Sequence, residues 1–309
     1  MGQVQGARGV KTADAARGKW RGILLALGVP KSALSGKHGP CPMCGGKDRF
    51  RFDNKDGAGT FFCSQCKPGN GFDLLQRLKG WDFRTAAAEV DRVVGNVKAE
   101  PVKPSLSPER RRDMLNRLWL SGERVRPGDP VHSYLDRRGL PMPQNIDSIR
   151  YVQNCPVPEE SGGRWAMVAM VSGPDGKPVT LHRTFLGPNG KADIAEPRAL
   201  MPGDVPPGSA VRLSMHGETL GIAEGIETAL KAGERFGVPV WAVINSVMLA
   251  KWIAPEGVRR VLIFGDNDPE FGGQAATFAL AHRLAVKGIE VEPHIPVTTG
   301  LDWADRDAA

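Results

Sequence analysis

The spacing of hydrophobic positions changes along the chain, and the last third alternates between short apolar runs and longer amphipathic stretches. Short apolar runs predict buried strands, and apolar residues three or four positions apart predict helices. Strands and helices that alternate at this spacing predict a parallel sheet with right-handed crossovers. The expected strands are residues 220–223, 238–244, 260–264 and 289–295, and the expected helices are residues 226–236, 247–253 and 274–287.

Helical spacing also flanks a different kind of segment near the N-terminus. Apolar residues in residues 12–28 predict an amphipathic helix, and residues 72–94 predict two short helices, the second with Asp82 as its N-cap. Between them, residues 38–71 are rich in glycine, cysteine and aromatic residues. This composition predicts a small ribbon rather than a helical bundle.

A Pro-rich segment separates this region from the rest. Residues 96–108 contain three prolines and few large apolar residues, which is typical of a linker. Residues 109–212 combine an expected helix over 110–124 with short strands and Pro/Gly turns. We therefore predict an α/β multidomain protein: an N-terminal ribbon domain with flanking helices (1–95), the linker, a mixed α+β basic subdomain (109–212) and a parallel-sheet α/β domain (213–309).

Composition narrows the class of protein. Hydrophobic residues make up 41% of the chain and charged residues 24%, which argues against both a disordered chain and a membrane protein. No apolar run approaches the ~20 residues of a membrane span, and the run at residues 22–29 fits an amphipathic helix better than a signal peptide. Four of the five cysteines form CxxC pairs, which favours a reducing cytoplasm. Cys155 is left over and is expected to be an ordinary thiol.

Charge is distributed unevenly along the chain. The net charge of +7 is the balance of 41 basic and 34 acidic residues. Residues 1–104 carry +9, residues 105–212 carry +3 and residues 213–309 carry −5. The basic N-terminal third is predicted to bind an anionic polymer, and the acidic C-terminal third is predicted to bind a metal.

The two CxxC pairs predict a zinc site. Cys41 and Cys44 are separated from Cys63 and Cys66 by 18 residues, an interval that fits a hairpin between two knuckles. Four thiolates form a closed tetrahedral shell, which suits one structural Zn²⁺. A redox CxxC pair and an iron–sulfur cluster are the competing interpretations, and His38 is a spare candidate ligand.

The expected hairpin carries basic and aromatic residues at alternate positions. Phe50 and Phe52 point to one face, Arg49 and Arg51 point to the other, and Lys47 precedes them. Single-stranded nucleic acid suits such a ribbon, because phosphates pair with Arg and Lys while bases stack on rings. The alternatives are that the phenylalanines form the core of the ribbon and that Lys47, Arg49 and Arg51 are solvated.

Three acidic residues follow expected strands of the parallel sheet. Glu224 follows residues 220–223, and Asp266 and Asp268 follow residues 260–264. Ligands gather at the carboxyl ends of parallel strands, and clustered carboxylates favour a divalent cation. Oxygen ligands favour Mg²⁺ or Mn²⁺, with solvated surface acids as the alternative. Further candidate ligands are Glu227, Asp302 and Asp305.

Motifs that the sequence lacks narrow the chemistry. It contains no GxxxxGK[ST] phosphate-binding loop and no GxSxG motif, and its six histidines have no metal-ligand spacing. Two metals held by carboxylates can clamp the attacking and leaving oxygens of a phosphoryl transfer. Polymerase, nuclease and strand-passage chemistry therefore remain.

Two groups of motifs resemble those of a known family. Residues 39–52 (GPCPMCGGKDRFRF) and 59–66 (GTFFCSQC) are similar to the zinc-binding domain of primases from satellite phages and plasmids. Residues 223–230 (AEGIETAL) and 264–268 (FGDND) resemble the two acidic motifs of a Toprim domain, and residues 301–305 (LDWAD) resemble a late acidic motif of the same group. A zinc ribbon followed by Toprim motifs is more specific than either alone.

The resemblance implies a DNA primase of the phage or plasmid type, which makes short RNA primers on single-stranded DNA by two-metal nucleotidyl transfer during replication. Residues 213–309 would then be a Toprim-like catalytic domain, in which Glu224 matches the first acid and Asp266 and Asp268 match the DxD pair. Its implied partners are single-stranded template, ribonucleoside triphosphates and, because no motor motif occurs, a replicative helicase in trans.

Basic residues of the middle segment resemble family positions as well. Residues 182–185 (HRTF) and Lys191 look like motif positions, and Arg183 and Lys191 lie around an expected turn. There they are candidates to bind template phosphates or a triphosphate, with solvated charge as the alternative. Arg198 is a weaker candidate for the same role.

The sequence departs from the bacterial replicative primases at two places. It has Thr228 where they have an acid, and residues 269–274 follow the DxD pair where they have a small-residue turn. These departures favour the phage or plasmid branch.

Two other functions remain open. One is a Toprim-type metal-dependent nuclease or topoisomerase, although the only tyrosines, Tyr134 and Tyr151, lie outside the expected parallel sheet. The other is a non-catalytic adaptor that binds single-stranded DNA during replication.

Overall fold

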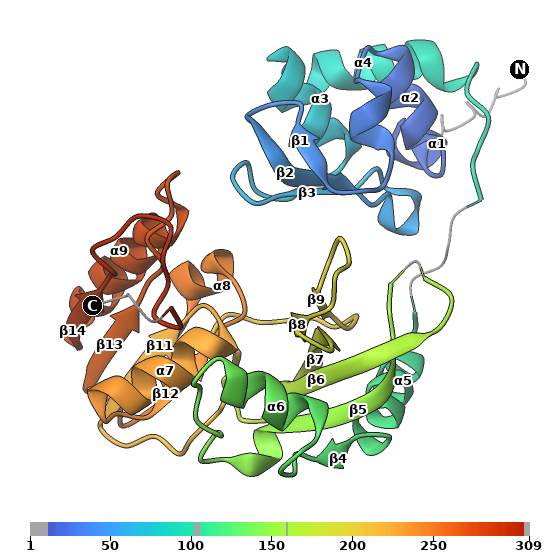
Figure 1. Cartoon of the computed structure of the whole chain (residues 1–309). Coiled ribbons are helices and arrows are strands. Elements are labelled where there is room, and N and C mark those ends of the chain that lie inside the picture. The colour runs from blue at the N-terminus through green and yellow to red at the C-terminus, as the bar shows by residue number, and fades with distance from the viewer. Residues whose placement is uncertain (1–11, 102–105, 159, 306–309) are drawn as a thin grey trace, which may run out of the picture. The chain divides into compact units, whose positions relative to one another are not determined.

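The computed structural model describes residues 12–101, 106–158 and 160–305, and the chain divides into two compact units, residues 1–107 and 108–309 (Figure 1). The N-terminal unit is a small ribbon with flanking helices. The C-terminal unit is built on a mixed sheet with helices. The α/β multidomain class predicted from the sequence is confirmed.

The N-terminal unit consists of a three-stranded antiparallel sheet and four α-helices among its described residues. The strands follow one another in the order β1-β2-β3. Its elements are α1 (Thr12–Ala16), α2 (Trp20–Ala26), η1 (Lys31–Leu34), β1 (Gly39–Cys41), β2 (Gly45–Phe52), η2 (Lys55–Gly57), β3 (Phe61–Cys63), α3 (Gly71–Lys79) and α4 (Phe83–Val94).

The two helices after the ribbon begin at side-chain caps. Asn70 accepts hydrogen bonds from the N–H groups of Phe72 and Asp73, and the carboxylate of Asp73 accepts one from the N–H of Asn70 in return. Asp82 accepts a hydrogen bond from the N–H of Thr85 at 2.7 Å, which confirms it as the N-cap of α4. Such caps satisfy N–H groups that have no partner within the helix.

Trp20 packs helix α2 against the ribbon. Its ring is buried and meets Phe72 edge-to-face, with 4.7 Å between ring centroids. A Cβ atom at Gly59 would lie 2.5 Å from the Trp20 side chain, and one at Gly71 would lie 2.1 Å from it. Both positions therefore require glycine for the helix to approach the ribbon this closely.

The C-terminal unit begins with a largely antiparallel half. Its strands β6 and β7 are ten residues each, longer than the short strands expected from the sequence. The elements are α5 (Pro108–Leu120), β4 (Glu123–Arg124), α6 (Pro130–Arg137), η3 (Ile146–Ser148), β5 (Ile149–Pro156), β6 (Gly163–Ser172), β7 (Pro178–Gly187), β8 (Gly190–Lys191), β9 (Arg198–Leu200) and β10 (Ala210–Val211).

The second half of this unit alternates strands and helices. Each expected strand and helix is present, with bounds shifted by a few residues. The elements are β11 (Thr219–Ala223), α7 (Ile226–Phe236), β12 (Val240–Ala242), α8 (Ser246–Lys251), β13 (Arg260–Phe264), α9 (Gly272–Ala285) and β14 (Glu290–His294). No helix in the described ranges is long and apolar enough to cross a membrane.

One sheet runs through both halves of the C-terminal unit. Over the described residues it has 11 strands, of which β14, β13, β11 and β12 lie side by side and are parallel. Strand β10 pairs antiparallel with β12 on one side and with β6 on the other. The short strand β10 thus joins the two halves within a single sheet.

The parallel strands are buried on both faces, as their continuous apolar runs predict. On β13, Leu262 and Phe264 belong to the core that includes helix α7. Val261 and Ile263 belong to the core on the other face, with Leu249 of α8 and residues of α9. Helices therefore cover both faces, and the carboxyl ends of the strands are left at one edge.

Candidate metal centres and catalytic site

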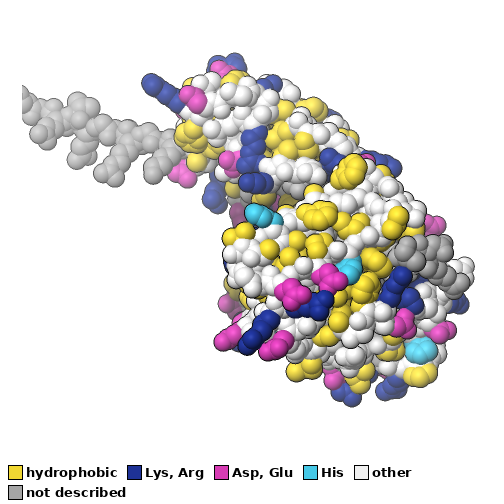
Figure 2. Space-filling model, turned by 90° about the vertical axis from the view of Figure 1, so that its left-hand side faces the viewer, with side chains coloured by type: hydrophobic (Ala, Val, Ile, Leu, Met, Phe, Trp, Pro, Cys, Tyr) yellow, Lys and Arg dark blue, Asp and Glu magenta, His cyan; other side chains and the backbone are white. Residues whose placement is uncertain are grey.

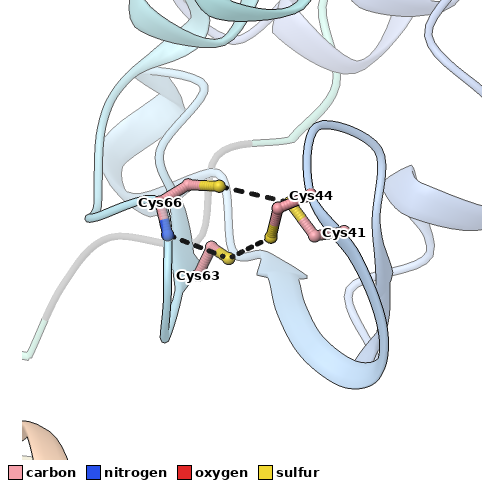
Figure 3. A group of neighbouring side chains, drawn as sticks. All are labelled: Cys41, Cys44, Cys63 and Cys66. Atoms are coloured by element: carbon pink, nitrogen blue, oxygen red, sulfur yellow. Dashed lines mark hydrogen bonds between the residues drawn. The ribbon is translucent and has the colours of Figure 1, made fainter. Parts of the chain in front are cut away.

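The four cysteines of the CxxC pairs lie together (Figure 3). All four sulfur atoms are within 4.8 Å of one another, with 4.0 Å between Cys41 and Cys66 and 3.7 Å between Cys44 and Cys63. Zn–S bonds of about 2.3 Å in a tetrahedron place sulfurs about 3.8 Å apart. The cluster therefore has the size of a zinc site.

Each CxxC pair folds as a knuckle. The N–H of Met43 points at the sulfur of Cys41, and the N–H of Cys66 points at the sulfur of Cys63, each at 3.4 Å. Burial raises the pKa of Cys41, which a metal would reverse, because zinc binds the thiolate. Among the described residues the cluster contains cysteines alone, and the ring of His38 instead contacts the carbonyl of Asp48 at 3.1 Å. Four sulfurs fill a tetrahedral shell, as a structural Zn²⁺ requires.

The phenylalanines of the ribbon form its core. Phe50 and Phe52 are almost fully buried, and Phe50 stacks on Phe61 with 5.4 Å between centroids. Of the two interpretations open from the sequence, the core one is correct. Lys47 and Arg51 are exposed, so the basic face of the ribbon is open to a ligand.

Glu224 and the DxD pair lie at the same edge of the parallel sheet. Strands β11 and β13 are neighbours, and Ala223 is in register with Phe264. Glu224 is the next residue after β11, and Asp266 comes two residues after the end of β13. Adjacent parallel strands therefore deliver these carboxylates together.

The acids raise each other's pKa. Burial raises the pKa of Glu224 to about 7, and the charges of Asp268 and Asp302 add to this effect. Burial raises the pKa of Asp266 to about 8, with further contributions from Glu224, Asp302 and Asp268. Arg198 opposes both shifts. Neighbouring carboxylates repel one another when they are ionised, so each favours the protonated form of the others near neutral pH. A bound cation would relieve this repulsion.

The carboxylates do not form a closed shell. In the described part of the chain, the four cysteines are the one group that brings three or more ligand atoms within 4.8 Å. Asp268 accepts a hydrogen bond from the N–H of Gly273 at 2.6 Å, whereas the buried Oδ1 atom of Asp266 has no hydrogen-bond partner. An unpartnered carboxylate oxygen beside other acids fits Mg²⁺ or Mn²⁺, which take oxygen ligands.

The last turn brings a further acid to this edge. Trp303 is buried, and its indole N–H donates to the carbonyl of His294 at 3.2 Å. Burial raises the pKa of Asp302, and the nearby Asp305 adds to this shift. Asp305 accepts a hydrogen bond from the N–H of Asp302 at 2.9 Å, so it closes the turn. Asp302 is thus the better placed of the two predicted ligands.

Asn267 joins the two acidic loops and was not singled out from the sequence. Its N–H donates to the carbonyl of Leu301 at 3.0 Å, and its carbonyl accepts from the N–H of Gly300. Gln274 in turn donates to the side-chain oxygen of Asn267 at 2.6 Å. Its position between the two predicted metal ligands Asp266 and Asp268 was the signal available, because an amide offers both donors and acceptors.

Glu227 lies in a buried ionic network next to the acids. Its carboxylate accepts a hydrogen bond from the Tyr134 hydroxyl at 2.6 Å and lies 3.1 Å from the ammonium of Lys191. Arg138 lies 3.9 Å away. Burial alone would raise the pKa of Glu227, but Lys191 and Tyr134 lower it to about 2. A carboxylate with these partners is better suited to hold α7 against α6 and β8 than to bind the predicted metal.

The predicted basic residues have different surroundings. Lys191 pairs with Glu227, as described. Arg183 is buried and donates to the carbonyls of Pro156 at 2.6 Å and Leu200 at 3.4 Å, which favours a structural role over the predicted phosphate contact. Arg198 is exposed and close enough to lower the pKa of two Toprim-motif acids. It is the best placed of the three to meet a ligand at the acids.

His182 and Cys155 were not predicted as ligand-binding residues. Burial lowers the pKa of His182 to about 4, so this imidazole is neutral near pH 7. Cys155 is fully buried, and burial raises the pKa of its thiol to about 11. A buried thiol that stays protonated is a poor nucleophile, which fits an ordinary thiol.

Three segments match known domain families. Residues 36–72 match the zinc-binding domain of primase-helicase, and residues 219–307 match the Toprim domain. Residues 109–213, which lie between them, match a domain of unknown function, DUF7146.

Solved structures of primases are also similar at low sequence identity. A primase fragment from Aquifex aeolicus that contains the zinc-binding and RNA polymerase domains is 14% identical and matches with a TM-score of 0.45, over 96% of this chain and 81% of that one. The primase fragment of the bacteriophage T7 primase-helicase protein is 15% identical with a TM-score of 0.42, over 87% of this chain and 92% of that one. In the content and order of its domains, the chain resembles phage and bacterial primases that carry a zinc ribbon and a Toprim domain.

Proposed function

We propose that this chain is a DNA primase, which synthesises short RNA primers on single-stranded DNA by metal-dependent nucleotidyl transfer. One observation carries the proposal: a primase-helicase type of zinc-binding domain and a Toprim domain occur on one chain, and the acids of the Toprim motifs follow adjacent strands. Either feature alone would fit several nucleic-acid enzymes.

We assign catalytic metal binding to the carboxylates at the edge of the sheet. Glu224, Asp266 and Asp268 would hold Mg²⁺ or Mn²⁺, with Asp302 as a further ligand. A bound pair of such cations stabilises the charge on the attacking and leaving oxygens of a phosphoryl transfer. Arg198, whose charge acts on Glu224 and Asp266, would bind the triphosphate.

We assign template binding to the basic face of the zinc ribbon. Arg49 and Arg51 alternate with the buried Phe50 and Phe52, and Lys47 lies two positions before Arg49, so the three charges share one side of β2. Phosphate contacts of this kind bind DNA without reading its sequence. Zinc would stabilise the ribbon and take no part in the chemistry.

The proposed substrates require partners that expose single strands. We infer that a replicative helicase supplies the template and that ribonucleoside triphosphates supply the primer. The four-thiolate zinc site is compatible with the reducing cytoplasm of a bacterial cell or of a phage or plasmid host.

The test is primer synthesis with labelled ribonucleotides on mixed single-stranded templates, with Mg²⁺ or Mn²⁺. We expect template-dependent products, and a loss of at least ~100-fold in Glu224→Gln, because an amide is a poor ligand for a hard cation. Glu218→Gln is the matched control, since this glutamate is exposed and lies at the opposite end of β11 from Glu224. We expect it to retain full activity.

Two results would overturn the proposed activity, and a third would overturn the assigned metal ligand. Cleavage of the template without nucleotides would indicate a nuclease. Tight binding of single-stranded DNA with no synthesis on any template would indicate an adaptor. Full synthesis by Glu224→Gln would exclude the assigned metal ligand.

A further inference from the structure

Phe271 occupies an unusual position at the start of helix α9. Its backbone is left-handed, with φ of 61° and ψ of 20°, a conformation that residues with bulky side chains rarely adopt. Its side chain is nevertheless large, and the residue is 69% exposed. Glycine or asparagine would satisfy the same backbone at lower cost.

The loop holds this residue beside the DxD pair. The N–H of Phe271 donates to the carbonyl of Asp268 at 3.0 Å, which closes a four-residue turn with Pro269 at its second position. In such a turn the first and last Cα atoms are within about 7 Å. The carboxylate of Asp268 is fixed by Gly273 in the next turn of chain. The backbone of Phe271 is therefore held within one turn of a proposed metal ligand.

Packing does not explain the aromatic ring. Helix α9 contributes Ala276, Leu280 and Leu284 to the core, which lie on its inner side. Among the described residues, the Phe271 ring makes no ring stacking or cation contact. The side of the molecule where α9 lies in Figure 1 faces the viewer in Figure 2, and hydrophobic side chains reach the surface there.

We propose that Phe271 is a positioning residue that stacks on a nucleobase of a nucleotide bound at the acidic edge. Exposed aromatic rings beside phosphate-binding sites are the usual platforms for bases, and the base can be of any kind because each has a π-face. The proposal rests on the proposed function, in which metals held by Glu224, Asp266 and Asp268 bind phosphates. The base belongs either to the incoming ribonucleotide or to the template strand.

Phe278 provides a comparison on the same helix. It is 57% exposed and lies seven positions after Phe271, within the helix that Phe271 precedes. A hydrophobic docking surface for a protein would use both rings. The left-handed backbone and the turn to Asp268 belong to Phe271 alone, which favours a ligand at the acids.

The experiment compares Phe271→Ala with Phe278→Ala in the full chain. Equilibrium binding is measured with Ca²⁺ in place of Mg²⁺, using three probes: ATP, inorganic tripolyphosphate and a single-stranded oligonucleotide. We expect Phe271→Ala to weaken ATP binding about 10-fold, the loss of one stacked base, and to leave tripolyphosphate binding unchanged because it has no base. Phe278→Ala should change neither, and Phe271→Trp should restore ATP binding.

The probes separate the two sources of the base. Weaker oligonucleotide binding with unchanged ATP binding would assign the base to the template strand and would still support stacking. Equal losses in the two alanine variants, or no loss with either base-bearing probe, would overturn the proposal. With Mg²⁺, a higher KM for nucleotides at unchanged kcat is the expected kinetic result.

A stability measurement separates stacking from a merely structural role. Phe271→Gly removes the backbone strain, so we expect its Tm to rise by about 2–4 °C while ATP binding falls. A fall in both would indicate a structural role. If primer synthesis fails while Phe271→Ala still distinguishes ATP from tripolyphosphate, the proposed function falls and the stacking site remains.

Discussion

The two predicted metal centres differ in how complete they are. The four cysteines already form a shell of the right size for Zn²⁺, with every sulfur within 4.8 Å of the others. The carboxylates are brought to one edge of the sheet but stay apart, and burial raises the pKa of both Glu224 and Asp266. The first site is closed by its two backbone knuckles, whereas the carboxylates of the second site repel one another in the absence of a cation.

This difference is the one expected between a structural centre and the proposed catalytic one. A closed shell leaves no position for a substrate, so its metal contributes to folding. An open set of oxygen ligands leaves positions for phosphate oxygens, at the expense of stability in the absence of metal. Five predictions test the contrast, from the largest expected effect to the smallest.

Loss of zinc should have the largest effect. We expect Cys63→Ser to lose its zinc and to unfold the N-terminal unit, because structural zinc supplies about 10 kcal/mol or more of folding free energy in small zinc domains. Zinc content and hydrogen exchange measure the two effects. Cys155→Ala is the control, since this cysteine lies outside the cluster, and it should keep one zinc per chain. Protection of residues 39–63 in the zinc-free variant would contradict the structural role.

Removal of the buried anion should have the next largest effect. We expect Glu227→Gln to lower the free energy of unfolding of the C-terminal unit by about 3 kcal/mol, because Lys191 and Arg138 lose their buried partner. Glu234→Gln breaks an exposed pair with Lys231 and should cost less than about 1 kcal/mol. Denaturant titration measures both. Equal losses would mean that the network adds nothing beyond an ordinary surface pair.

The same network gives a pH dependence. Because the pKa of Glu227 is lowered to about 2 in the folded chain, its contribution is complete above the ordinary pKa near 4.5 and is lost as the pH falls toward 2. The stability gap between the wild type and Glu227→Gln should therefore narrow between pH 5 and pH 3. If this stability difference did not change with pH over the same range, the ionised carboxylate of Glu227 would not be the source of the stabilisation.

Neutralising one acid of the open site should raise the stability of the fold, whereas removal of Glu227 lowers it. The pKa of Asp266 is raised to about 8, so its contribution to stability is complete below its ordinary pKa near 3.8 and is lost as the pH rises through 8. We expect Asp266→Asn to be about 1–3 kcal/mol more stable than the wild type at pH 8.5 without added Mg²⁺, with a gap that narrows as the pH falls to 5 and that closes only near the ordinary pKa. Thermal denaturation measures the difference, and it is carried out without a chelator so that zinc stays bound.

Added Mg²⁺ provides the control for this variant. It should stabilise the wild type at pH 8.5 and leave Asp266→Asn unchanged, because the variant has lost a ligand. The same stabilisation of both proteins would show that the acids do not bind the cation.

The smallest effect concerns the basic face of the ribbon. We expect the double variant Lys47→Ala, Arg51→Ala to bind single-stranded DNA more weakly and to lower the slope of log affinity against log salt by about 0.7 for each lost phosphate contact. Lys287→Ala in the other unit should leave the slope unchanged. Fluorescence anisotropy over a range of salt measures both. An unchanged slope in the double variant would remove these residues from the DNA-binding surface.

Local patterns predicted much of the fold. The parallel strands are continuous apolar runs because helices cover both faces, and such runs are visible without a structure. The long strands β6 and β7 were expected to be short, since their many Pro and Gly neighbours suggested frequent turns. Strand β10 has only two residues, and its place is decided by partners on β6 and β12 that lie far away in the sequence.

In the candidate sites, too, features with a local sequence signal were predicted and features that depend on distant residues were not. Cysteine spacing and acids after apolar runs are local signals, and they led to the zinc cluster and to the acidic edge. The partners of Glu227 are not local: Tyr134 lies 93 residues before it. Arg183 lies in a motif that resembles a ligand-binding one, but its guanidinium donates to the carbonyls of Pro156 and Leu200, which only the folded sheet brings near it.

The pairing of strand β10 bears on how this chain can be divided for experiments. The family matches meet between residues 213 and 219, which suggests a place to separate a Toprim fragment. A fragment that begins there would lack Val211, the residue paired with Ala242, and would expose the edge of β12 to other chains. We expect fragments cut there to aggregate, whereas a fragment that starts at residue 108 keeps the whole sheet.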